Sequence, residues 1–202
     1  MTLLQLLRRQ DGLVRHDQAR RLGLSPAAVG RRVDSGEWLV VHPRVYLAAT
    51  HELTPRARLR AAALWAGEGA TLIGHAGAAW WDLTDRPPGI IAIAVGPTAG
   101  HTPPPGIRAV RRTVSPLDRV SVDGVWVARQ SFTALEAATT LGLVEGARLL
   151  DRALQRRRFG VPAPAGGPAR HGPAARRGPG SPTGRAGRRP RGRRPSGTRS
   201  AC

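Results

Sequence analysis

The residues best suited to chemistry in this sequence are the arginines between residues 15 and 44. A guanidinium group can donate paired hydrogen bonds to phosphate oxygens or to the two acceptors of a guanine. Arg31 and Arg32 lie in a segment where Val29 and Val33, four residues apart, predict the buried stripe of a helix. At about 100° per residue, Arg31 points roughly opposite that stripe and Arg32 lies on its flank. This pattern favours a helix that presents arginine to the major groove of DNA.

The residues before that helix predict a tight turn. Gly23 is suited to end a preceding helix, because glycine takes the left-handed conformation without a Cβ clash. Ser25 is a typical helix cap, and Pro26 follows at the first helical position. Leu24 and Val29 are placed to form a hydrophobic staple across the turn. The sequence therefore predicts a helix-turn-helix.

A β-hairpin is expected directly after the second of these helices. Residues 38–48 carry β-branched and aromatic residues on both sides of His42-Pro43-Arg44, and leucines at 3, 4, 6 and 7 predict an earlier amphipathic helix. A helix-turn-helix followed by a hairpin is a winged helix, and we assign it to residues 1–50. Arg44 would lie at the tip of the wing, near a phosphate or the minor groove.

We expect Arg31 and Arg32 to contact bases or groove edges, and Arg15, Arg20 and Arg21 to position the DNA backbone. The whole predicted DNA-binding set is Arg15, Arg20, Arg21, Ser25, Ala27, Ala28, Arg31, Arg32 and Arg44. The alternative interpretation is an ordinary helical pair whose arginines form a solvated face, and Gly30 and Asp34 on the same helix weaken the DNA-binding case.

Residues 12–48 resemble the N-terminal winged helix of the AbiEi-type antitoxin family, the regulators of type IV toxin–antitoxin systems. The resembling features are Gly-Leu-Val at 12–14, Gly-Leu-Ser at 23–25, Ser-Gly-Glu-Trp at 35–38 and His-Pro-Arg-Val-Tyr at 42–46. The family usually has glycine where this chain has Arg44, so a turn that needs a positive φ would be strained here. The resemblance extends through roughly residue 158. It implies a regulator that represses its own operon and counteracts a toxin encoded nearby.

Charge and composition agree with a polyanionic partner. The chain has 202 residues and no lysine, with 32 arginines against 13 acidic residues and a formal net charge of +19. The single cysteine, Cys202, excludes an intramolecular disulfide and fits a cytoplasmic protein. The longest strongly apolar run, residues 90–95, is far shorter than a membrane span. We therefore predict double-stranded DNA as the partner and no membrane association.

The second region, residues 51–158, predicts a small α+β domain, which makes the expected fold class α+β. Thr54 and Ser131 are the expected caps of two of its helices, and Asp123-Gly124 predicts a hairpin turn. Asp151 is expected to form a surface charge pattern with its neighbours Arg148 and Arg152. The expected helices cover 55–66, 76–83, 131–141 and 144–157, and the expected strands cover 90–95, 107–114, 120–122 and 125–127.

The composition changes abruptly after Arg158. Residues 159–202 contain 10 arginines, 10 glycines and 8 prolines, and Phe159 and Val161 are the only sizeable apolar residues. Such a segment buries too little surface to offset its chain entropy, so we predict a disordered basic tail. Three origins stay open: a frameshifted or decayed C-terminus, a functional tail that contacts phosphates, or a plain linker-like end.

No active site is recognisable in the sequence. The six histidines lack metal-ligand spacing, and no nucleophile elbow or phosphate loop is present. His75 could act as a catalytic base, but we expect a helix-start residue whose ring is hydrogen-bonded locally. Asp82 and Asp85 could bind a cation, but we expect them to lie at a solvated helix end. We predict a non-enzymatic protein without metal or cofactor. Two alternatives stay open: a protein-interaction module that does not need DNA, and the remnant of a two-domain nuclease-like protein.

Overall fold

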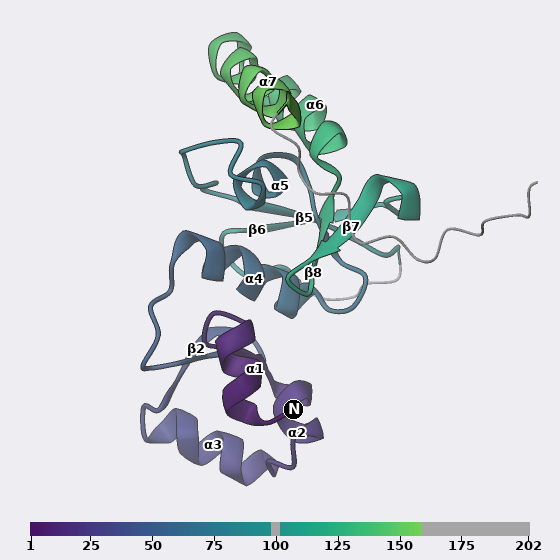
Figure 1. The fold of residues 1–202 in the computed structure, drawn as a ribbon. Helices are drawn as coiled ribbons and strands as arrows, with labels where there is room; N and C mark the ends of the chain where they lie inside the picture. The colour runs from purple at the N-terminus through teal and green to yellow at the C-terminus, as the bar shows by residue number, and fades with distance from the viewer. Residues whose placement is uncertain (98–101, 159–202) are drawn as a thin grey trace, which may run out of the picture. The chain divides into compact units, whose positions relative to one another are not determined.

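The computed structural model describes residues 1–97 and 102–158, which belong to one compact unit. The predicted tail, residues 159–202, lies outside the described residues. The described fold is a mixture of α-helices and two β-sheets, in agreement with the predicted α+β class (Figure 1). Its first six elements are α1 (Leu3–Arg9), β1 (Leu13–Arg15), α2 (His16–Arg21), α3 (Pro26–Asp34), β2 (Trp38–His42) and β3 (Val45–Ala48).

The first sheet is three-stranded and antiparallel, in the order β1-β3-β2. Because side chains alternate along a strand, Val14 and Ala48 pack with Leu6, Val29 and Trp38 in a core beneath α1, α2 and α3. The side chains on the other face of this sheet include Leu13, Val45 and Leu47. They belong to a second core, which includes α4. This sheet is therefore covered on both faces.

The turn between α2 and α3 has the predicted chemistry. Gly23 has a φ of 91°, and the Ser25 hydroxyl accepts a hydrogen bond from the Ala28 N–H at 3.1 Å. Leu24 and Val29 belong to the same core, as a hydrophobic staple requires. The end of α2 and the start of α3 are thus set by local sequence.

The second sheet has five strands in the order β6-β5-β4-β8-β7. Two pairs, β5 with β6 and β4 with β8, are parallel, whereas β4 with β5 and β7 with β8 are antiparallel. The elements of this region are α4 (Pro55–Ala66), β4 (Thr71–Leu72), α5 (Gly74–Trp80), β5 (Ile91–Val95), β6 (Ile107–Arg111), a 3₁₀ turn (Pro116–Asp118), β7 (Arg119–Val122), β8 (Val125–Ala128), α6 (Gln130–Thr140) and α7 (Leu143–Arg158).

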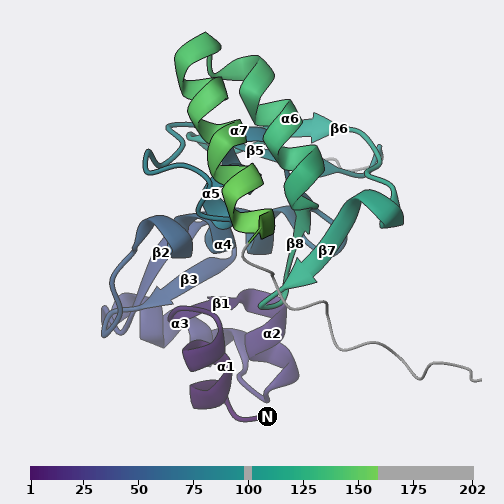
Figure 2. The same cartoon turned by 45° about the horizontal axis from the view of Figure 1, so that its top comes forward.

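Helices cover this sheet on both faces. Ile91, Ile93 and Val95 of β5 share a core with α4, whereas Ala92 and Ala94 share a cluster with Phe132 of α6. Helices α6 and α7 form a hairpin and lie side by side in both views (Figures 1 and 2). Leu149 and Ala153 of α7 pack with α5 and α6 in a further cluster.

Several predictions for the second region hold and others need correction. Thr54 caps α4 as predicted, and Asp123 and Gly124 form the hairpin turn with φ values of 51° and 78°. Helix α5 covers 74–80 instead of 76–83, and β6 ends at Arg111, before Val114. The predicted cap Ser131 is wrong, because α6 begins at Gln130 and its cap position is Arg129. The boundary assigned between residues 50 and 51 stays a prediction.

Candidate nucleic-acid interface

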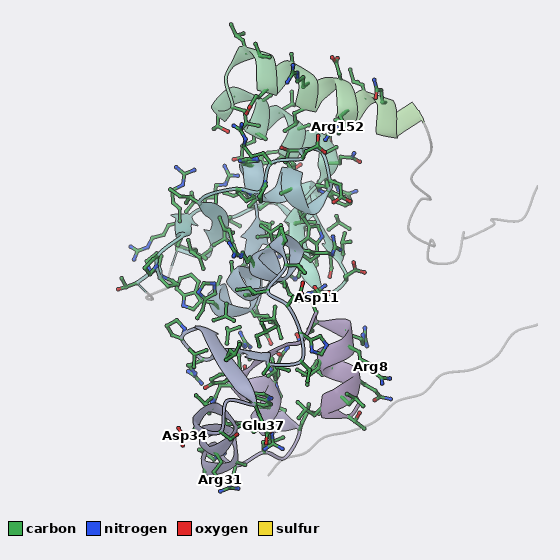
Figure 3. The ribbon with its side chains drawn as sticks, turned by 90° about the vertical axis from the view of Figure 1, so that its left-hand side faces the viewer. Arg8, Asp11, Arg31, Asp34, Glu37 and Arg152 are labelled. Atoms are coloured by element: carbon green, nitrogen blue, oxygen red, sulfur yellow. The ribbon has the colours of Figure 1, made fainter. Side chains whose placement is uncertain are left out.

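The outer face of α3 consists of Ala27, Arg31 and Asp34, spaced by four and three residues. All three are exposed, and Val29, on the inner face, is fully buried. Within the described part of the chain, the Arg31 side chain forms no ion pair or hydrogen bond. Figure 3 shows Arg31 pointing away from the ribbon at the free side of this helix. Its guanidinium group is therefore available to an external acceptor.

Small side chains occupy the first turn of α3. Ser25 and Ala27 are exposed and Ala28 is half-buried. The Ser25 hydroxyl oxygen accepts the Ala28 N–H, and its own proton is still free to donate. A helix start with short side chains lets a large partner approach the backbone closely, as in a recognition helix whose first turns contact base edges.

Arg32 differs from Arg31 because it is held by its own chain. Its Nε lies 3.5 Å from Glu37 Oε2, and its guanidinium carbon lies 5.6 Å from the Trp38 ring centroid. Its Nη1 also donates to the Ala28 carbonyl at 3.3 Å. Arg32 thus joins α3 to the start of β2, and its predicted contact with DNA would require these contacts to loosen.

Arg20 on α2 and Arg44 between β2 and β3 are both exposed. Neither side chain has a partner within residues 1–97 and 102–158. Arg44 has a φ of 65°, the left-handed conformation that favours glycine. Its carbonyl accepts a hydrogen bond from the His16 N–H at 2.8 Å, which fixes the turn against the start of α2.

Arg15 and Arg21 both pair with Asp17. Arg15 donates to Asp17 through Nε and through Nη2, the latter at 2.6 Å, and Arg21 Nη2 lies 2.5 Å from Asp17 Oδ2. Partial burial raises the pKa of Asp17, but the hydrogen bond from Arg15 and the charges of Arg15 and Arg21 outweigh it and leave the pKa below its ordinary value. These two arginines are already neutralised in part, unlike Arg20 between them.

A second group of arginines lines a cavity of about 740 Å³. Its lining includes Arg15 and Arg21 together with Arg56 and Arg60 of α4. None of its lining residues comes from α3. The cavity is therefore distinct from the outer face of α3.

Arg60 is the most buried of these arginines, with only 3% of its side chain exposed. Its Nε donates to Asp11 Oδ2 at 2.7 Å, and its Nη1 donates to the Asp123 carbonyl at 2.6 Å. Arg56 Nη2 lies 2.7 Å from the Asp123 carboxylate, and its guanidinium group covers the Trp80 ring at 4.0 Å. These contacts link the turn before β1, helix α4 and the β7–β8 hairpin.

Sequence reasoning missed this arginine group. The spacing of Arg56 and Arg60, four residues apart on one helix, was a signal that they share a face. Their acidic partners are 49 and 67 residues away, so the pairing itself had no local signature. Its role in the structure is to join segments, and we do not include it in the interface.

The residues weighed for catalysis are held by other contacts. The ring of His75 makes the predicted local hydrogen bond, to the Arg86 carbonyl at 3.0 Å. Asp85 pairs with Arg152, at 2.6 Å, and Asp151 and Arg148 are exposed on the surface of α7. Among the described residues, no group of three histidine, cysteine, aspartate or glutamate residues is placed to hold a metal ion. None of the described helices has the length and apolar character needed to cross a membrane.

The segment that carries the outer face of α3 has the element order α1-β1-α2-α3-β2-β3, with arginine on the free side of its longest helix. Residues 1–49 match the model of a family described as "Transcriptional regulator, AbiEi antitoxin". The resemblance stated from the sequence is therefore confirmed for this segment. No match to a curated protein was found.

Proposed function

We propose that this chain is a DNA-binding transcriptional regulator whose residues 1–50 form a winged helix. Helix α3 would be the recognition helix, α2 the supporting helix, and the β2–β3 hairpin the wing. The observation that carries the proposal is Arg31, exposed and without a partner among the described residues, on the outer face of α3. The match of residues 1–49 to the AbiEi regulator family supports it.

Each predicted contact residue has a role in this proposal. Arg31 would donate to base acceptors in the major groove, and Ser25, Ala27 and Ala28 would allow close approach. Arg20 and Arg44 would contact phosphates on either side. Arg15, Arg21 and Arg32 would contribute only after exchanging Asp17 or Glu37 for a phosphate, so we expect smaller effects from them.

Charge supports a nucleic-acid partner for this segment. Residues 1–50 hold eight arginines and four acidic residues, an excess that attracts a polyanion. Asp34 is the last residue of α3 and lies on its outer face (Figure 3). Its negative charge would repel a phosphate at that position. It would keep phosphate away from the end of α3 beyond Arg31.

By the family match, we further propose that the regulator represses its own operon in the cytoplasm and acts as an antitoxin toward a protein encoded nearby. Residues 51–158 would serve the antitoxin role. The proposal includes no catalytic step, metal or cofactor.

Binding to DNA under a salt series tests the proposal. The full chain is titrated against the DNA upstream of its own gene and against random DNA of the same length, from about 50 to about 300 mM salt. A preference of about a hundredfold or more for the upstream DNA at all salt concentrations supports a sequence-reading regulator. Weak, equal and steeply salt-dependent binding to both would contradict it and favour the protein-interaction alternative.

A further inference from the structure

Helix α7 exposes a stripe of apolar residues along one face. Leu143, Ala147, Leu150 and Leu154 are spaced by four, three and four residues, which places them in a single row. Leu143 is 94% exposed and Leu154 is 60% exposed. The neighbouring face of α7, with Leu149 and Ala153, is buried against α5 and α6. Leu150 is itself half-buried against that cluster, so the described fold leaves the stripe uncovered chiefly at Leu143, Ala147 and Leu154.

A groove of about 420 Å³ runs beside this stripe, between α6 and α7. Small residues form much of its wall: Ala138 and Thr139 from α6, and Gly142, Gly146 and Ala147. Helix α7 approaches α6 closely here, since a Cβ on Gly146 would lie 2.8 Å from the Ala138 carbonyl oxygen. One surface thus presents both projecting leucines and a hollow of small residues, as a self-complementary two-fold contact requires.

Two charges on one side of the stripe, Asp151 next to it and Arg148 farther round the helix, fit the same arrangement. Arg148 and Asp151 are exposed, and neither forms an ion pair among the described residues, whereas the adjacent Arg152 pairs with Asp85. If two α7 helices pack antiparallel about a point between Ala147 and Leu150, each Leu143 lies against Leu154 of the second copy. Each Arg148 then lies near Asp151 of the second copy, and symmetry makes that contact twice.

The segment that follows α7 in this chain has few apolar side chains that could cover the stripe. Among residues 159–202, Phe159 and Val161 are the only sizeable apolar side chains, and arginine, glycine and proline dominate. Exposed apolar stripes of this kind mark interaction sites. We propose that a second copy of this chain covers the α7 stripe, so that the protein is a two-fold dimer through antiparallel α7 helices.

The dimer goes beyond the proposed function because it depends only on α6 and α7. Its formation can succeed or fail whether or not α3 binds DNA. If both hold, one dimer carries two copies of the outer face of α3 and is suited to a DNA site with two related halves.

Sedimentation equilibrium of the full chain, from about 1 to about 100 µM, tests the proposal. We expect a monomer–dimer equilibrium that Leu143→Glu weakens at least about tenfold, because the carboxylate would be buried without a partner. The matched control is Leu117→Glu, at a residue that is 79% exposed in the 3₁₀ turn outside α6 and α7; it should dimerise like the wild type. Circular dichroism establishes that both variants are folded.

A charge exchange tests the antiparallel arrangement. Arg148→Asp and Asp151→Arg should each weaken the dimer, because each places like charges together, and the double variant should restore it. A wild-type chain that stays monomeric over the whole range overturns the proposal. Equal behaviour of Leu143→Glu and Leu117→Glu also overturns it, and a double variant no stronger than the single ones overturns the antiparallel packing.

Discussion

Arg31 on α3 and Arg60 on α4 have the same side chain and opposite surroundings. Arg31 on α3 is exposed and has no partner in the described residues, whereas Arg60 on α4 is buried between Asp11, the Asp123 carbonyl and the Trp80 ring. A buried guanidinium needs such compensation, because leaving it unpaired costs several kcal/mol. An exposed one is fully hydrated and can exchange water for a phosphate or a base. The number of arginines alone therefore does not locate the proposed DNA-contacting surface, because an arginine must also be exposed and free of acidic partners to bind a phosphate or a base.

Breaking the buried group should give the largest effect. Arg60→Ala removes the ion pair with Asp11, the hydrogen bond to the Asp123 carbonyl and the contact with Trp80. Because Asp11 is itself partly solvated, we expect a loss of about 2–3 kcal/mol in the free energy of unfolding, near the lower end for buried pairs. Urea denaturation measures it.

The control for this prediction is Arg58→Ala, on the same helix but exposed and without a described partner. It should change stability by no more than about 0.5 kcal/mol. Equal destabilisation by the two variants would show that the buried contacts of Arg60 contribute nothing specific.

Two neighbouring arginines on α2 sharpen the comparison. Arg20→Ala should weaken binding to upstream and random DNA alike, about fivefold near physiological salt, and lower the slope of affinity against salt by about 1. Arg21→Ala should have a smaller effect on both, because Asp17 already neutralises that guanidinium group. Fluorescence anisotropy across a salt series measures the slopes. Identical slopes for the two variants would contradict the assignment.

Arg44 combines exposure with a strained backbone. Arg44→Gly should raise the free energy of unfolding by about 1 kcal/mol, because glycine tolerates the φ of 65°. The same substitution should weaken DNA binding, since it removes a wing charge. Arg44→Ala is the control, because it removes the charge and retains the strain. A less stable glycine variant would mean that Arg44 makes contacts that outweigh its conformation.

Acidic pH should reduce the free energy of unfolding through His42 and Asp17, among other groups. Burial lowers the pKa of His42 below its ordinary 6.5. Burial raises the pKa of Asp17, but the hydrogen bond from Arg15 and the charges of Arg15 and Arg21 outweigh it and leave that pKa below 3.8. The unfolded chain then binds more protons than the folded chain, so stability falls as pH drops below 6.5 for His42 and below 3.8 for Asp17.

The contribution of His42 is measured by comparing the denaturation midpoints of the wild type and of His42→Asn across pH. The wild type should lose more stability than the variant between about pH 7.5 and about pH 5. Parallel curves would contradict the burial effect on His42.

Local sequence predicted those parts of the fold that local interactions determine. The Ser25-Pro26 and Thr54-Pro55 starts of α3 and α4 and the Asp123-Gly124 turn depend on residues only a few positions apart. Strand β1 was not predicted, because three residues have no clear periodicity and form a strand only by pairing with β3, some thirty residues later. Cap chemistry also failed at α6, where Arg129 and not Ser131 precedes the helix.

The candidate site was predictable to a similar extent. Periodicity placed Arg31 opposite Val29, as the structure has it. It did not reveal that Arg32 turns toward Glu37 and Trp38, because that contact depends on how the chain leaves α3. The pairings of Arg60 with Asp11 and of Arg152 with Asp85 join segments 49 and 67 residues apart, beyond any local rule.

The central claim is that Arg31 reads DNA sequence, and one measurement tests it directly. The affinity of the full chain for upstream DNA is divided by its affinity for random DNA at one salt concentration, for the wild type, Arg31→Ala and the exposed control Arg58→Ala. We predict that Arg31→Ala lowers this ratio about 10- to 100-fold, equivalent to about 1–3 kcal/mol, and that Arg58→Ala leaves it unchanged. An Arg31→Ala variant that loses affinity equally for both DNAs, or loses none, would contradict the claim.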